Sequence, residues 1–216
     1  LTNSGDYYLV TAPDGTIEKY YRLDGVAHGG HLASRVSPNG EAVTLSYDSF
    51  DRITEAQRTY TVDGVTRSQV FSYTYGAGDH SERIASVTLR LLDERGWSQT
   101  QRALYTYYDA NDPNGLLGDL QSATRQLRRE GIGWEDVGTD YYRYYKGGAG
   151  EPGFAHALKY VLSPEAYARL VAAHGKAALA PDAVVATYAD NYFEYDDQSR
   201  VVLETTAGGG FEDDPR

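Results

Sequence analysis

Two histidines stand in the short run His28-Gly29-Gly30-His31, where imidazole nitrogens could bind a metal ion. A zinc site needs three or four protein ligands, and thiolates are absent because the chain has no Cys. No third ligand follows at a suitable spacing. We therefore interpret this run as a solvated glycine-rich loop, with metal binding as the alternative.

A second group of side chains could supply oxygen ligands to calcium. It comprises Asp109, Asn111, Asp112, Asn114 and Asp119. An EF-hand loop, however, requires a ligand and a glycine where Pro113 and Asn114 stand here. We expect a turn in which Asp and Asn side chains cap the backbone, and calcium binding is the alternative.

Acidic pairs occur at Glu135-Asp136, Asp196-Asp197 and Asp213-Asp214, and paired carboxylates are the catalytic groups of glycosidases. Neighbouring residues of a strand point to opposite faces, so these pairs fit solvated charge better. The sequence also has neither a nucleophile elbow nor a glycine-rich phosphate loop. We predict that the chain is not an enzyme and uses no cofactor or metal, with a carbohydrate-active enzyme as the alternative.

The most informative pattern is a recurring Tyr-Asp pair that is followed by Arg and an aliphatic residue. Tyr47-Asp48 precedes Arg52-Ile53, and Tyr195-Asp196 precedes Arg200-Val201 at the same spacing. A looser copy starts at Tyr75, with Asp79 and Arg83-Ile84, and a variant at Tyr107-Tyr108-Asp109. Spacings of roughly 20–50 residues are typical of repeat arrays. The predicted structural signature residues are Tyr47, Asp48, Arg52, Tyr75, Tyr108, Asp109, Tyr195, Asp196 and Arg200.

Each copy of this signature predicts a β-hairpin. Val43, Leu45 and Tyr47 alternate with polar residues, as in a half-buried strand, and turn-forming residues follow. We expect the Tyr ring to be buried against the sheet and the Asp side chain to bind the turn amides. The Arg is expected to pair with that Asp or to lie over a neighbouring Tyr ring.

These residues resemble the RHS/YD-repeat family, which includes bacterial RHS proteins, the C component of insecticidal toxin complexes and the teneurins. The resemblance is most specific over residues 47–54 and 195–203, although Asp51 and Ser199 replace the usual turn glycine. It implies a long sheet of hairpins that spirals into a hollow shell around a C-terminal effector. The family's self-cleaving core is not visible, since Asp112-Pro113 is not followed by its pattern.

Composition supports a soluble piece of a larger protein. The 216 residues contain no Met, and no apolar run approaches the roughly 18 residues of a membrane span. We expect an exported bacterial protein, secreted or at the cell surface, whose export signal lies outside this segment. The net charge of −11 disfavours nucleic-acid binding. The 20 Tyr residues suit sheets with partly wet faces, because a Tyr ring packs while its hydroxyl reaches water.

Turn and cap signals predict the elements. Asp14-Gly15, Asn39-Gly40 and Asp63-Gly64 indicate hairpins, and residues 147–153 a flexible loop. Ser163, Pro164 and Gly175 are an N-cap, a first helical residue and a stop, so a helical insertion is expected over about residues 163–189. We predict a mainly β fold: one antiparallel hairpin-repeat segment over residues 1–216 with that insertion.

The predicted function is structural: wall strands of an RHS-type shell that enclose or display a C-terminal effector. Its partners would be neighbouring repeats and the effector of the same polypeptide. The alternative is an adhesion module whose Tyr-rich surface binds glycans or cell-surface proteins. Because repeat units bury their faces against adjacent units, we also expect unpaired edges or exposed apolar side chains at Leu9-Val10 and Val201-Val202-Leu203.

Overall fold

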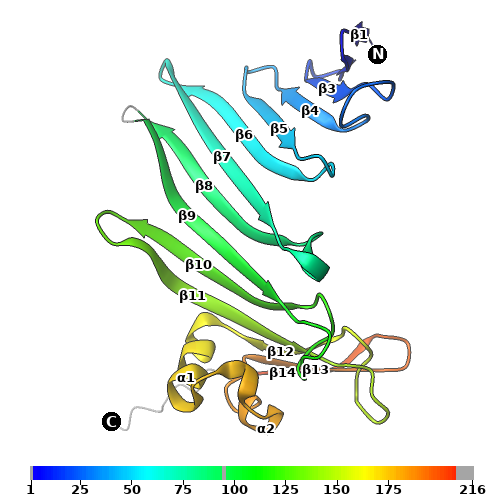
Figure 1. The fold of residues 1–216 in the computed structure, drawn as a ribbon, viewed down its shortest axis with the longest axis vertical. Helices are drawn as coiled ribbons and strands as arrows, with labels where there is room; N and C mark the ends of the chain where they lie inside the picture. Colours follow the sequence, from blue (N-terminus) through cyan, green and yellow to red (C-terminus); the bar gives the residue numbers. More distant parts are fainter. Residues whose placement is uncertain (1, 94–95, 208–216) are drawn as a thin grey trace. The chain divides into compact units, whose positions relative to one another are not determined.

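The computed structural model describes residues 2–93 and 96–207 (Figure 1). The fold is mainly β, and the strands follow one another in the sheet in the order of the sequence, which confirms the predicted antiparallel hairpin sheet. The strands are β1 (Thr2–Ser4), β2 (Tyr7–Thr11), β3 (Ile17–Tyr21), β4 (Leu32–Val36), β5 (Ala42–Tyr47), β6 (Ile53–Val62), β7 (Val65–Tyr75), β8 (Ile84–Asp93), β9 (Gly96–Tyr107), β10 (Leu120–Arg129), β11 (Gly133–Tyr144), β12 (Leu158–Leu162), β13 (Asn191–Tyr195) and β14 (Val201–Thr206).

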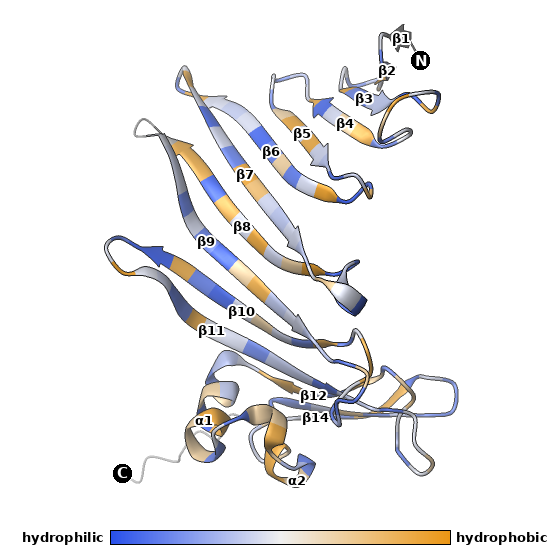
Figure 2. Ribbon diagram, viewed as in Figure 1, coloured by the Kyte–Doolittle hydropathy of each residue, from blue (hydrophilic) through white to orange (hydrophobic). Residues whose placement is uncertain are grey.

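The chain forms two compact units. The first comprises the described residues of Leu1–Tyr75, Ile84–Arg102 and Leu127–Gly133, and the second those of Gly76–Arg83, Ala103–Gln126 and Trp134–Arg216. Apolar and polar residues alternate along β8 of the first unit (Figure 2). This period-2 pattern is what a strand with two different faces requires.

The odd strands β3, β5, β7, β11 and β13 each lose their register with the following even strand just before a tyrosine. In the β5–β6 pair the register shifts between Ser46 and Tyr47, so that Tyr47 stands opposite Ile53, the first residue of β6. The same shift occurs before Tyr75, Tyr144 and Tyr195. One extra residue on the even strand is a β-bulge, which bends the strand and redirects side chains. The bulge therefore recurs where the signature tyrosine stands.

The helical insertion lies in the second unit. Helix α1 (Pro164–His174) starts at Ser163, whose hydroxyl accepts a bond from the Ala166 amide, and ends at Gly175, whose φ is 80°. The 3₁₀ turn Ala177–Leu179 and helix α2 (Asp182–Val185) follow. The predicted insertion is confirmed, and the capping residues explain it, because side-chain oxygens satisfy amides that lack a partner in the first turn.

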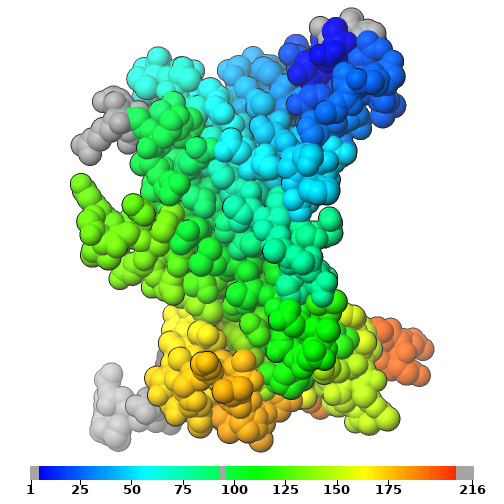
Figure 3. Space-filling model, in the orientation of Figure 1, coloured from blue at the N-terminus to red at the C-terminus, as the bar shows by residue number. Residues whose placement is uncertain are grey.

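The insertion packs on the strands of its own unit. Its apolar side chains share one buried cluster with residues of β11 and β12. The space-filling view shows the insertion, in yellow and orange, as a close-packed block (Figure 3). The buried members are Tyr141, Tyr160, Leu162, Ala166, Leu170, Ala177, Ala180 and Val185.

Two expectations need detail from the structure. Leu9 pairs with Thr2 of β1, so β1 and not Leu9-Val10 begins the strand order, but the apolar side chain of Val10 is exposed. The loop of residues 147–153 contacts the rest of its unit at its end, where the ring of Tyr145 lies against Gly153 and the carbonyl of Pro152 accepts a bond from the Tyr195 amide. Glycine content suggested flexibility, but here the missing Cβ makes room for a ring.

Candidate functional site: tyrosine contacts at the hairpin turns

The first signature hairpin is closed by the carboxylate of Asp48. Its Oδ1 accepts bonds from the backbone amides of Phe50 and Arg52, at 2.9 and 3.1 Å. Its Oδ2 accepts from Arg52 Nε at 2.8 Å and lies 2.6 Å from Arg52 Nη2. These bonds, that from the Arg52 side chain first, lower the pKa of Asp48. Asp51, where the family has glycine, takes a left-handed φ of 61°.

The second signature hairpin repeats these contacts. Asp196 Oδ1 accepts from the amides of Gln198 and Arg200, each at 2.9 Å. Its Oδ2 lies 2.7 Å from Arg200 Nε and 2.6 Å from Nη2. Ser199 has a φ of 62°, in the place of Asp51. The expected tethering of the turn by Asp and the pairing of Arg with Asp are therefore confirmed in both copies.

The signature tyrosines bind the backbone of an earlier strand. Tyr47 donates its hydroxyl to the carbonyl of Leu32 at 2.8 Å, Tyr75 donates to Ile53 at 2.8 Å, and Tyr195 donates to Leu158 at 3.0 Å. Each acceptor is the first residue of the preceding even strand, namely β4, β6 or β12. We call this contact the tyrosine tie. It links two neighbouring hairpins within one unit.

The tie tyrosines pack on the sheet but are half-buried, where burial was expected. The hydroxyl has to reach the backbone at the end of a strand, where the sheet offers less cover. Loss of solvent around the ring still raises the pKa of Tyr47 and of Tyr195. Both therefore remain neutral hydrogen-bond donors at physiological pH.

Arg52 and Arg83, which stand just before Ile53 and Ile84, each cover the ring of a following tyrosine. The Arg52 guanidinium lies 4.3 Å from the centre of the Tyr75 ring, and that of Arg83 lies 5.9 Å from the Tyr107 ring. A guanidinium over a ring face is attracted by the ring quadrupole. At Arg52-Ile53 the two parts of the signature act on one tyrosine: the Arg52 guanidinium covers the Tyr75 ring, and the Ile53 carbonyl accepts the Tyr75 hydroxyl.

The looser copies depart from the signature. Arg83 Nη1 donates to the backbone carbonyl of Asp79 at 3.0 Å, and its Nε donates to that of Gly118 at 3.1 Å. Asp109 Oδ1 lies 2.9 Å from His80 Nε2 in the neighbouring loop. The Tyr-Asp-Arg hairpin is thus formed at Asp48 and Asp196, while Asp109 joins two loops instead.

Tyr108 makes a different contact from the tyrosine tie. It is fully buried, and its hydroxyl donates to the carbonyl of Tyr142, in the next odd strand, at 2.7 Å. Burial strongly raises the pKa of its hydroxyl. A Cβ on Gly115 would lie 2.3 Å from a ring atom of Tyr108, so only glycine fits over this ring.

Tyr145 is the counterpart of Tyr108 and was not among the predicted signature residues. It is fully buried and donates to the carbonyl of Phe193 at 2.8 Å. A Cβ on Gly153 would lie 2.1 Å from its ring. The available signal was the Tyr-Tyr doublet, at residues 107–108 and 144–145, followed seven or eight residues later by a glycine.

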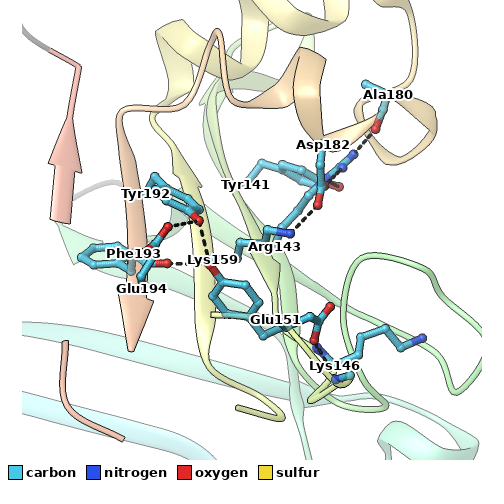
Figure 4. A network of polar contacts seen from close by, with 12 residues as sticks. Tyr141, Arg143, Lys146, Glu151, Lys159, Ala180, Asp182, Tyr192, Phe193 and Glu194 are labelled. Carbon is cyan, nitrogen blue, oxygen red and sulfur yellow. Dashed lines mark hydrogen bonds and ion pairs between the residues drawn. The ribbon is translucent and has the colours of Figure 1, made fainter. Parts of the chain in front are cut away.

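A buried arginine fixes the insertion to the sheet (Figure 4). The Arg143 side chain is 1% exposed and lies 2.6 Å from Asp182 Oδ1. It also donates to the carbonyls of Ala177 and Ala180 at 2.8 and 2.6 Å. Lys159 Nζ lies 2.6 Å from Asp182 Oδ2. Burial alone would raise the pKa of Asp182, but bonds from Lys159 and Arg143 lower it, so the carboxylate stays charged.

The acidic side chains of the oxygen-rich loop bind the protein itself. Asp112 Oδ2 accepts from the Asp109 amide at 2.7 Å, and Asp119 Oδ2 accepts from the Leu116 amide at 2.8 Å. Backbone capping is therefore confirmed. His28 of the His-Gly-Gly-His run lies 2.6 Å from Asp51. Within residues 2–93 and 96–207, no group of three or more His, Asp or Glu is arranged to hold a metal. The pair Asp213-Asp214 lies outside the described residues.

No family model matches the chain, and no curated protein matches it. In the described part of the chain, no helix is long and apolar enough to cross a membrane.

Proposed function

We propose that this chain is a structural β-repeat segment of an RHS/YD-type protein. It would contribute wall strands to a compartment that encloses or displays an effector, with no catalysis of its own. The tyrosine tie is the observation that carries this proposal. Tyr47, Tyr75 and Tyr195 each make a tie that joins their hairpin to the preceding one. Contacts that repeat between nearest neighbours are the hallmark of an array.

The polar contacts also support an architectural role. The signature carboxylates bind turn amides and arginine, and the buried Arg143 holds the insertion. Buried polar groups need such partners, and here the fold itself supplies them. The proposed setting is an exported bacterial protein, and the proposed partners are the neighbouring repeats and the effector of the same polypeptide.

Limited proteolysis of the whole polypeptide that contains this sequence tests the proposal. The portion that follows the repeat segment should resist protease in the intact protein. Tyr195→Ala should expose it, whereas Tyr188→Ala, which removes a ring on the insertion, is the matched control. Equal protease sensitivity with and without the tie would contradict an enclosing role. Binding of the isolated chain to glycans or cells would favour adhesion instead.

A further inference from the structure

The two signature hairpins differ in the exposure of the arginine. The carboxylates of Asp48 and Asp196 are equally covered, at 21% and 20% exposed, and both lie 2.6 Å from their arginine. Arg52 is 20% exposed, but Arg200 is 68% exposed. The difference reflects what lies over each arginine. Arg52 covers the ring of Tyr75, which comes from the following odd strand.

The strand that begins beside Arg200 is exposed along its whole length. Every residue of β14 is exposed, including the apolar Val201 at 52%, Val202 at 61% and Leu203 at 43%. β14 is the last strand of the described sheet. Exposed apolar side chains on an edge strand are an association hazard that proteins normally cover. The corresponding strand β6, which begins at Ile53, pairs with β7 along this edge.

The backbone geometry at both places is the same. Tyr195 stands opposite Val201 after a register shift, as Tyr47 stands opposite Ile53. At the first place, the Ile53 carbonyl accepts the Tyr75 hydroxyl and Arg52 covers the Tyr75 ring. Arg200 and Val201 thus present the acceptor half of a tyrosine tie.

We propose that Arg200 and the Val201 carbonyl form a binding site for the terminal tyrosine of an antiparallel strand that pairs with β14. The occupant is the first strand of a further hairpin of the same repeat array, so this inference rests on the proposed function. Its tyrosine hydroxyl donates to the Val201 carbonyl, and its ring lies under the Arg200 guanidinium. The chemistry required is an extended segment that ends in tyrosine.

A fused probe tests this site. The eleven residues of β7, Val65–Tyr75, are the natural occupant of the Arg52-Ile53 site and can be joined after Arg216 through a Gly-Ser linker. A short flexible linker gives an effective concentration on the order of millimolar, which favours weak strand pairing. Hydrogen exchange of the β14 amides, followed by NMR, then reports the population of the paired state.

The fused strand should slow exchange of the β14 amides. Tyr75→Phe in the fused copy should weaken pairing roughly fivefold, the effect of one neutral hydrogen bond. Arg200→Gln should weaken pairing of the Tyr-ended strand by a similar factor. Its effect on the fused strand with Ala in place of Tyr75 should be small, because no ring is then present.

Each other outcome overturns the inference in a recognisable way. Equal protection by the Tyr- and Phe-ended strands would remove the tyrosine site but leave strand addition, and hence the proposed function, intact. Absence of protection by any fused strand would overturn both the site and the continuation of the array at β14. Protection that depends on protein concentration without a fused strand would assign the edge to a second copy of the chain.

Discussion

At the scale of the residue, tyrosine contributes both an aromatic ring that packs and a hydroxyl that donates a hydrogen bond. A phenylalanine at position 47 would fill the same space, but it could not donate to the carbonyl of Leu32. The hydroxyl reaches across to a backbone acceptor while the ring packs against neighbouring rings. This combination explains why tyrosine dominates the aromatic residues, with 20 Tyr beside 5 Phe.

Substitution of Tyr47 and Tyr195 should separate these two contributions. Tyr→Phe should lower the free energy of unfolding by about 1 kcal/mol, the usual worth of one hydrogen bond. Tyr→Ala should lower it by about 2–4 kcal/mol, somewhat less than the loss for a fully buried ring. Denaturant titration provides the measurement. If Phe and Ala variants were equally unstable, the ring would have no packing role.

Arg52 and Arg200 form a matched pair, because both bind an Asp and only Arg52 covers a tyrosine in the described structure. Arg52→Gln should therefore be more destabilising than Arg200→Gln, by about 1 kcal/mol, which is typical of a cation–π contact. Thermal unfolding of the two variants measures this difference. Equal effects would show that only the pairing with Asp matters.

Acid should open the signature turns. Contacts with Arg52 and Arg200 lower the pKa values of Asp48 and Asp196. A depressed pKa stabilises the folded state above the unfolded pKa of Asp, near 3.9, and this stabilisation is lost as pH falls through the lower folded value. The free energy of unfolding, measured between pH 6 and about pH 2.5, should fall as the two carboxylates are protonated. Asp48→Asn should make the free energy of unfolding depend less steeply on pH. An unchanged dependence would show that Asp48 does not stabilise the turn through its charge.

At the scale of the element, hairpins with short turns could be predicted from their turn residues, whereas strands that follow long loops could not. Asp14-Gly15, Asn39-Gly40 and Asp63-Gly64 each stand in a strand connection of the structure, and the Ser163-Pro164 start fixed α1. Strand β12 was missed because the loop before it holds no Tyr-Asp pair. Tyr145 was missed for the same reason: Lys146 follows it, and its partner Gly153 becomes a neighbour only after the loop folds back.

The loop glycines should be intolerant of alanine where a tyrosine lies beneath them. Gly153→Ala would bring a Cβ to 2.1 Å from the Tyr145 ring, and Gly115→Ala to 2.3 Å from the Tyr108 ring. Each should destabilise by about 1–3 kcal/mol, as overpacking does. Gly148→Ala is the control, since its Cβ would be 3.5 Å from Glu151. Equal melting temperatures for Gly153→Ala and Gly148→Ala would show that the loop can move aside.

At the scale of the whole molecule, stability is supplied by neighbours in sequence order. Strand order follows the chain, and the apolar residues gather where the insertion meets β11 and β12. Sequence patterns could not reveal this, since Arg143 and Asp182 lie 39 residues apart and neither belongs to the repeat signature. The repeat can be recognised in the sequence because its contacts join residues close together in the chain. The Arg143–Asp182 pair that holds the insertion forms only after tertiary packing.

The exposed strand β14 should make association of the chain sensitive to salt. Apolar side chains on an edge favour association, while a net charge of −11 opposes it, and salt screens that charge over about 10 Å at 0.1 M. Light scattering should therefore rise with salt for the chain itself. A chain extended by one signature hairpin at each end should scatter less and unfold at a higher denaturant concentration, because the added hairpins cover the present edges.

Val202→Lys is the control, since a lysine on an exposed edge blocks pairing while keeping the fold. If the unextended chain stayed monomeric at every salt concentration and matched the extended chain in stability, its edges would need no neighbours, and a self-contained binding module would become the better description.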